Sequence, residues 1–306
     1  MGRDAFDASP RARAIFEEAD ETLGMGLSKL CFEGPEDDLR RTEIQQPAIL
    51  TTSLALLGAL EDEVGPLVPE RVDFVGGHSL GEYSALVAAG ALRFDEAVRT
   101  VRLRGRLMQE AVAEGRGAMA AILGIPADVV QDACARAEEE TGLVVTPANF
   151  NSPQQTVIAG DAAAVEIACN RARELGAKRT LPLPVSAPFH CSLMEPAARE
   201  LEPALLELDF QRAAPPVITN VEAKANVEAK RMPELLRRQV TAPVRFTDMI
   251  AEMKALGVDA FLEVGPGRVL SGLIARIDRR ARRASFSSLE DLDGVRGLVT
   301  ESEGSD

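Results

Sequence analysis

Apolar residues recur at helical spacing through much of the first 115 positions, between turns that contain Gly and Pro. Residues 9–24 carry an apolar face, with Ser9 as a capping residue and Pro10 in the first turn. Residues 47–60 are apolar nearly all round, which is typical of a buried helix. A short apolar run at 72–76 predicts a strand. Two further helices are expected at 82–92 and 94–114.

The region 117–185 has a different rhythm, in which strand-like and helix-like segments follow in the order β-α-β-β-α-β. This order, over about 70 residues, is the ferredoxin-like pattern. We therefore expect residues 116–186 to form a small inserted domain. The expected strands are 117–123, 143–148, 156–159 and 178–185, and the expected helices are 126–140 and 161–175.

After the insert the alternation of helices and strands resumes. The pattern thus predicts an α/β protein whose larger domain is discontinuous and consists of residues 1–115 and 187–284. Residues 285–306 are rich in Ser, Asp, Glu and Gly, and we expect a flexible tail there. The expected helices after the insert are 192–206, 233–240, 246–256 and 269–277, and the expected strands are 216–219 and 259–264.

Charge and composition narrow the range of functions. The chain has 34 Lys and Arg against 48 Asp and Glu, a net charge of −14, which argues against nucleic acid or an anionic membrane as a partner. No apolar targeting segment opens the sequence, and no apolar run of about 18 residues predicts a membrane span. The four cysteines are widely spaced, which is typical of reduced thiols in a cytoplasmic protein and favours neither disulfides nor a metal site.

The sharpest chemical signal is the motif Gly77-His78-Ser79-Leu80-Gly81, a G-x-S-x-G between an expected strand and an expected helix. In a nucleophile elbow this turn lifts the serine hydroxyl to the N-terminus of the helix, where developing negative charge is favoured. The N–H of Leu80 would then be an oxyanion donor. The alternative is a Gly-rich strand–helix turn in which Ser79 only caps the helix.

A nucleophilic Ser79 needs a base, and the chain has only two histidines. His78 is the sequence neighbour of Ser79 and would be directed away from it. His190 is therefore the candidate base, on a loop between an expected strand and helix, although a structural histidine is the alternative. No aspartate is identifiable as a third member, so a backbone carbonyl could orient His190. Cys191, beside His190, is expected to be a small buried residue.

The stretch Gly77–Leu86 (GHSLGEYSAL) resembles the active-site motif of malonyl-CoA:acyl carrier protein transacylases. The resemblance extends over roughly residues 1–283. It implies an α/β-hydrolase-like core domain that carries a ferredoxin-like insert. Further segments match the same family in the same order: Gln46-Pro47-Ala48, Gly117–Ala120, Asn149–Pro153, Pro188-Phe189-His190 and Glu263–Gly267.

The resemblance also implies a ping-pong acyl transfer from malonyl-CoA to acyl carrier protein, through a malonyl ester of Ser79, with His190 as the base. By position in the family, the main-chain carbonyl that holds His190 falls on Gln239, and Arg104 is the residue that binds the malonyl carboxylate. From the residues alone Arg104 does not stand out, because Arg99, Arg102 and Arg106 share its expected helix.

Two further positions match family residues that contact the substrate. Gln46 matches a site glutamine, although it could equally be a turn residue before Pro47. Phe189, with Leu80, resembles the malonyl-selective pattern, because an aromatic side chain there would narrow the acyl pocket. The family works without a cofactor, and we expect a monomer.

One departure from the family lies at the start of the sequence. Members normally begin with a strand and a Gly-Gln-Gly-Ser-Gln loop, which supplies a second oxyanion N–H, before a segment like Met1–Asp4. We therefore expect a partly unpaired sheet and a loss of about 10²–10³ in rate from one missing donor. The alternatives to a transacylase are a serine hydrolase with the same elbow and an N-terminally truncated, inactive fragment.

Overall fold

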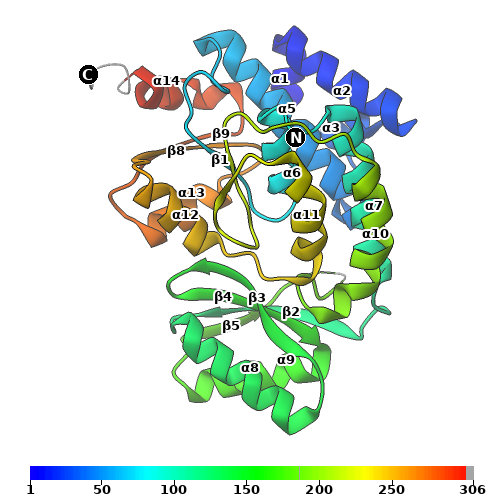
Figure 1. Cartoon of the computed structure of the whole chain (residues 1–306), viewed down its shortest axis with the longest axis vertical. Helices are drawn as coiled ribbons and strands as arrows, with labels where there is room; N and C mark the ends of the chain where they lie inside the picture. Colours follow the sequence, from blue (N-terminus) through cyan, green and yellow to red (C-terminus); the bar gives the residue numbers. More distant parts are fainter. Residues whose placement is uncertain (186, 301–306) are drawn as a thin grey trace.

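The computed structural model describes residues 1–185 and 187–300, which form an α/β fold in two parts stacked along its long axis (Figure 1). The larger part contains both ends of the described chain. The smaller part, at the bottom of Figure 1, is formed by residues of the middle of the chain.

Helices dominate the first part of the chain and surround one long buried helix. They are α1 (Arg3–Ala8), α2 (Pro10–Leu23), α3 (Leu27–Glu33), α4 (Glu36–Arg40), α5 (Thr42–Val64), α6 (Gly81–Ala88) and α7 (Phe94–Glu110). As expected from its apolar sequence, α5 is buried on nearly all sides, because α2 and α7 pack against it. Ser9 caps α2 as predicted, accepting the N–H of Ala12 at 3.1 Å. The short helices α1, α3 and α4 were not expected.

The strands of the larger part form two separate sheets. In the first, β1 (Val75–Gly76) pairs in parallel with β6 (Val217–Ile218), which pairs antiparallel with β7 (Ala225–Asn226). In the second, β8 (Ala260–Val264) pairs in parallel with β9 (Arg282–Phe286). Among the described residues one edge of β1 and one edge of β8 have no strand partner. The expectation of an incompletely paired sheet stays a prediction, because every open sheet has such edges.

The helices that follow the insert complete the larger part. They are α10 (Glu195–Glu207), α11 (Met232–Thr241), α12 (Phe246–Ala255) and α13 (Val269–Ile277), with 3₁₀ turns at Ser192–Met194 and Ala229–Arg231. α10 packs against both α7 and α11, so helices from either side of the insert share one core. The expected helices of this region are thus present, with ends displaced by a few residues.

The smaller part has the expected element order β-α-β-β-α-β. Its elements are β2 (Gly117–Leu123), α8 (Ala127–Thr141), β3 (Val145–Ser152), β4 (Gln155–Asp161), α9 (Ala162–Glu174) and β5 (Arg179–Pro182). The antiparallel sheet has the order β3-β4-β2-β5, and α8 and α9 cover the face that points away from the larger part (Figure 1). On the other face, Met119, Ala121 and Val157 pack with Cys191. The insert therefore lies directly against the loop that carries His190.

Residues 285–300 differ from the expected flexible tail. They form the end of β9 and the helix α14 (Leu292–Thr300), joined by a 3₁₀ turn at Leu289–Asp291. Val295 is fully buried, and the N–H of Leu289 donates to Asp4 at 2.7 Å. The polar composition was misleading because Phe286 and Val295 lie in the core and Leu289, Leu292 and Val299 pack against it. The remainder of the expected tail, residues 301–306, lies outside the described residues.

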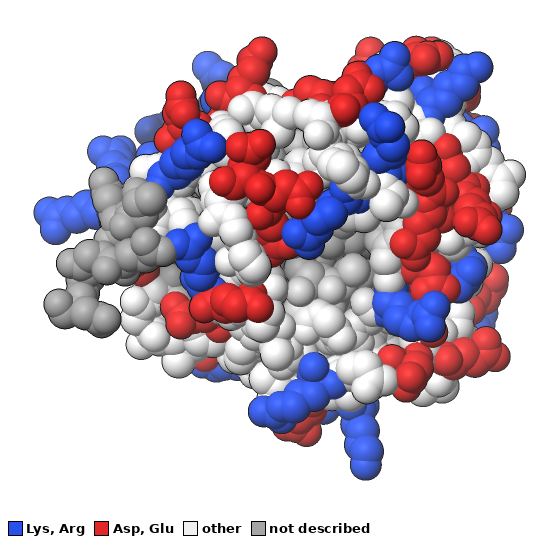
Figure 2. Space-filling view, turned by 90° about the horizontal axis from the view of Figure 1, so that it is seen from above, with Lys and Arg blue, Asp and Glu red and all other residues white. Residues whose placement is uncertain are grey.

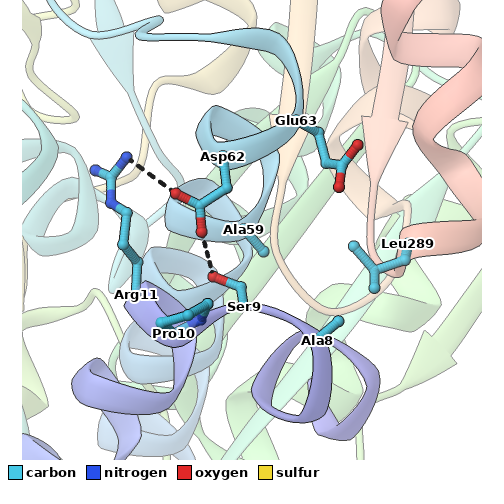
Figure 3. A pocket seen from close by; sticks show the side chains of 8 residues that line it. All are labelled: Ala8, Ser9, Pro10, Arg11, Ala59, Asp62, Glu63 and Leu289. Carbon is cyan, nitrogen blue, oxygen red and sulfur yellow. Dashed lines mark hydrogen bonds and ion pairs between the residues drawn. The ribbon is translucent and has the colours of Figure 1, made fainter.

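A surface recess marks the place where this C-terminal segment meets the first helices. Figure 3 shows Ser9 and Arg11 directed toward Asp62 on α5, with Leu289 on the opposite side. The Ser9 hydroxyl donates to Asp62 at 2.6 Å, and an Arg11 nitrogen lies 3.7 Å from the same carboxylate. These contacts join α2 to α5, and the recess includes none of the residues expected in the serine site.

The surface mixes charges of both signs. In the view of Figure 2, Lys and Arg side chains lie next to Asp and Glu side chains, in keeping with the many exposed ion pairs between helical residues. Within the described ranges, no helix combines the length and the apolar character that a membrane crossing requires.

Candidate active site

Ser79 lies in the sharp turn between β1 and α6. Its backbone φ is 51°, in the left-handed region that side chains other than glycine rarely adopt. A Cβ atom at Gly77 would lie 2.3 Å from the backbone of Gly81, so the turn can close this tightly only with glycine at position 77. The local sequence thus produces a strained elbow of the kind that presents a nucleophile.

His190 approaches Ser79 from the loop after the insert. Its Nε2 lies 2.8 Å from Ser79 Oγ, and its Nδ1 lies 2.8 Å from the main-chain carbonyl oxygen of Gln239. A carbonyl can only accept, so Nδ1 carries the proton and Nε2 is free to accept the serine proton. His78 points elsewhere, with Nε2 2.8 Å from Asn151 Oδ1 on β3. The structure therefore places the two histidines where the sequence predicted.

Burial keeps the imidazole of His190 neutral. It lowers the pKa of His190 from 6.5 to about 3, and the positive charge of Arg104 acts in the same direction. A neutral histidine with Nε2 unprotonated can act as a general base on the Ser79 hydroxyl. By contrast, burial raises the pKa of the Cys191 thiol to about 11. Cys191 is thus a neutral packing residue in the interface with the insert, as expected.

The pKa of His190 predicts how stability depends on pH. Below pH 6.5 the histidine takes up a proton in the unfolded chain but not in the folded one, so the folded state loses stability as the pH falls from 6.5 toward 3. Between pH 7.5 and pH 5 the wild type should lose about 2 kcal/mol of unfolding free energy relative to His190→Gln. Urea denaturation of both proteins across this range measures the difference, and parallel curves would contradict the assignment.

Arg104, on α7, is a buried cation beside the nucleophile. Only 1% of its surface is exposed. One terminal nitrogen donates to Ser79 Oγ at 3.0 Å and to Gln239 Oε1 at 2.9 Å, and the other donates to Gln46 Oε1 at 2.7 Å. Because Arg104 can only donate, Ser79 Oγ must accept from it and direct its own proton toward His190. The hydroxyl is therefore already oriented for proton transfer.

The acceptors around Arg104 are all neutral. Among the described residues no carboxylate forms an ion pair with it, and its Nε has no hydrogen-bond partner. Burial lowers the pKa of Arg104, which nevertheless stays protonated because guanidinium is so strongly basic. The nearby carboxylate of Glu82 acts on Arg104 only without direct contact, and raises its pKa. A buried guanidinium that no carboxylate contacts can bind a substrate that brings a negative charge close to Ser79.

The other arginines on α7 lie in different surroundings. Arg99 is exposed and donates to Asp95 at 2.5 Å, and Arg102 donates to the main chain of Leu23 at 3.2 Å. Arg106 is exposed. Arg104 differs from these neighbours only in lying on the buried face of the helix. The sequence pattern alone therefore could not distinguish it from the other arginines.

The remaining predicted residues line the same centre. Gln46 is 7% exposed and contacts Arg104 through Oε1. Phe189 is half-buried and packs where the insert meets the larger part. The N–H of Leu80, at the start of α6, has no protein acceptor among the described residues and is available as an oxyanion donor. The expected lack of a second donor stays a prediction.

Two buried polar residues of the centre were missed at the level of sequence. Glu82 is 1% exposed, and its Oε2 accepts from the Gln239 side chain at 2.6 Å and from the N–H of Asn220 at 3.1 Å. Burial raises the pKa of Glu82 to about 7. Asn220 is fully buried at the end of β6. Two features of the sequence could have indicated them: Glu82 is a lone acidic residue on an apolar helix, and Asn220 is a polar residue just after a buried strand.

The side chains of this centre do not form a cluster of metal ligands among the described residues. Within residues 1–185 and 187–300, no group of three or more His, Cys, Asp or Glu side chains is arranged to hold a metal ion. What the arrangement can do is activate a serine hydroxyl, bind a carboxylate near it, and stabilise charge at the start of α6.

Comparison with known proteins gives a consistent match. The family model described as "Acyl transferase domain" matches residues 1–284. The malonyl CoA-acyl carrier protein transacylase of Bacillus subtilis is 47% identical over 293 residues, which are 96% of this chain and 90% of the relative. An acyl carrier protein S-malonyltransferase from Vibrio cholerae superposes with a TM-score of 0.92 at 44% identity, covering 96% of this chain and 94% of that structure.

A second solved structure includes a partner. It is a type II PKS acyl-carrier protein in complex with its malonyl-transacylase, and the match has a TM-score of 0.91 at 42% identity, covering 97% of this chain and 94% of that one.

Proposed function

The chain belongs to the acyl transferase family, and from this premise we propose that it transfers a malonyl group from malonyl-CoA to the pantetheine thiol of acyl carrier protein in fatty acid synthesis. The observation that carries the proposal is the buried Arg104, which forms no ion pair with any described carboxylate and lies 3.0 Å from the Ser79 hydroxyl. A malonyl thioester has a carboxylate at one end and an electrophilic carbonyl at the other, and it therefore matches both groups.

In the first half-reaction Ser79 Oγ attacks the thioester carbonyl carbon while His190 Nε2 takes the hydroxyl proton. The N–H of Leu80 stabilises the oxyanion, and the carbonyl of Gln239 stabilises the imidazolium through Nδ1–H. When the intermediate collapses, the C–S bond breaks and His190 returns the proton to the sulfur of coenzyme A. The product is a malonyl ester of Ser79.

In the second half-reaction the pantetheine thiol of acyl carrier protein gives its proton to His190 and attacks the ester carbonyl. The C–O bond to Ser79 breaks, and Oγ recovers the proton from His190. Throughout both steps the Arg104 guanidinium holds the malonyl carboxylate, with Gln46 fixing the guanidinium from the far side. Phe189 and Leu80 would limit the width of the acyl pocket.

The finer description of the architecture is also a proposal. A βαββαβ insert with strand order β3-β4-β2-β5 supports a ferredoxin-like domain, and the strand–elbow–helix unit around Ser79 supports an α/β-hydrolase-like core. One chain supplies every residue of the site, which supports a monomer. Four free, buried cysteines support a cytoplasmic location.

Incubation with malonyl-CoA tests the proposal. Intact-protein mass spectrometry should show one malonyl group on Ser79, and added acyl carrier protein should remove it while becoming malonylated. Acetyl-CoA, which lacks the carboxylate, is the matched control and should label the protein far less. Release of malonate without an adduct would favour a serine hydrolase, and the absence of both adduct and hydrolysis would favour an inactive fragment.

A further inference from the structure

The side chain of Asn220 forms hydrogen bonds with the backbone of the turn that contains Ser79. It is fully buried just after β6, which pairs with β1. Its Oδ1 accepts the N–H of Ser79 at 2.6 Å, and its Nδ2 donates to the carbonyl of Gly77 at 2.7 Å. One side chain thus satisfies the two peptide groups on either side of His78, in the turn that the strained φ of Ser79 makes irregular. The bond also occupies the N–H of Ser79.

The carboxylate of Glu82 connects Asn220 to Gln239, the residue whose main-chain carbonyl accepts a hydrogen bond from His190. Its Oε2 accepts the main-chain N–H of Asn220 and the side-chain N–H of Gln239, at 3.1 Å and 2.6 Å. Gln239 in turn binds three groups of the centre. Its carbonyl accepts from His190 Nδ1, its Nε2 also donates to the carbonyl of Ser79 at 3.0 Å, and its Oε1 accepts from Arg104.

The polarity of these contacts decides which way the Gln239 amide points. Arg104 can only donate and the carbonyl of Ser79 can only accept, so the amide must turn its oxygen to Arg104 and its nitrogen to the Ser79 carbonyl and Glu82. A reversed amide would place two acceptors together at Glu82 and two donors together at Arg104. The ionised carboxylate of Glu82 supports this orientation, although the Glu82 side chain itself contacts neither Arg104 nor Ser79.

We propose that Glu82 and Asn220 are positioning residues of the acyl transfer. Their hydrogen bonds to the backbone of the turn and to Gln239 fix the relative positions of Ser79, His190 and Arg104. This inference rests on the proposed function. Neither side chain contacts the reacting atoms, so their removal should leave substrate binding nearly intact and slow the chemistry. A displacement of the nucleophile by about 1 Å can cost a factor of about 100 in rate.

The test compares Asn220→Ala and Glu82→Gln with the control Asn226→Ala. Asn226 is a buried asparagine on the next strand, where its Nδ2 donates to the carbonyl of Glu228 at 3.2 Å, away from the centre. We expect Asn220→Ala to lower kcat about 100-fold and Glu82→Gln about 10-fold, with KM for malonyl-CoA changed less than about threefold. Asn226→Ala should lower the Tm comparably and leave kcat within about twofold.

A double variant separates positioning from a general loss of stability. If both residues fix the same set of positions, the double variant Glu82→Gln with Asn220→Ala should lose less kcat than the product of the two single losses. Should Asn220→Ala fail to fold, Asn220→Asp keeps the shape and the bond to the Ser79 N–H but opposes the Gly77 carbonyl, and it should show the same loss in kcat.

The outcomes distinguish this inference from the function on which it rests. A wild-type protein without malonyl transfer would remove the proposed function. If the wild type is active and the Asn220 and Glu82 variants keep its kcat, or change it only as much as Asn226→Ala does, the positioning role alone is overturned.

Discussion

Ser79→Ala should lower the turnover of malonyl transfer by about a millionfold, the loss that accompanies removal of a serine nucleophile from such a centre. Without Oγ no malonyl ester can form, and His190 Nε2 loses the hydroxyl that lies 2.8 Å away. Steady-state transfer to acyl carrier protein measures the rate, and intact mass measures the adduct.

The matched control for this variant is Ser84→Ala. Ser84 lies on α6, the helix that follows Ser79, and its hydroxyl has no hydrogen-bond partner among the described residues. We expect it to transfer malonyl at the wild-type rate. Removing His190 as well as Ser79 should add little further loss, because the two act as one unit. Measurable acylation of the Ser79→Ala protein would rule out the serine mechanism.

Arg104→Met should change which acyl group the protein accepts. The variant removes the buried cation but keeps a side chain of similar length, so kcat/KM for malonyl-CoA should fall about a thousandfold. Acetyl-CoA has no carboxylate to leave unpaired, and its kcat/KM should fall much less or rise. The ratio of the two values is independent of the folded fraction, because both are measured on the same sample.

Arg99→Met provides the control from the same helix. Arg99 is exposed and paired with Asp95, and its loss should leave the malonyl-to-acetyl ratio unchanged. An unchanged ratio in Arg104→Met as well would show that the carboxylate is bound elsewhere and would withdraw the main support for malonyl transfer.

Local patterns in the sequence predicted most of the elements and the candidate nucleophile. The β-α-β-β-α-β rhythm delimited the insert, and the G-x-S-x-G motif predicted the elbow, because both depend on residues close together along the chain. His190 followed by elimination from two histidines. The segment 285–300 was mistaken for a tail because its Ser, Asp, Glu and Gly content outweighed the helical spacing of Leu289, Leu292, Val295 and Val299.

The sequence by itself therefore predicted the order of most elements, the turn that contains Ser79 and the candidate base. The resemblance to the family singled out Arg104 among four arginines, but only the tertiary structure placed it against Ser79 and showed that Glu82 binds both Asn220 and Gln239. Periodicity records which face of an element is buried, but it does not record what packs against that face. Ser79 lies 111 positions from His190 and 141 from Asn220, so their contacts exist only once the strands and the insert have brought those segments together.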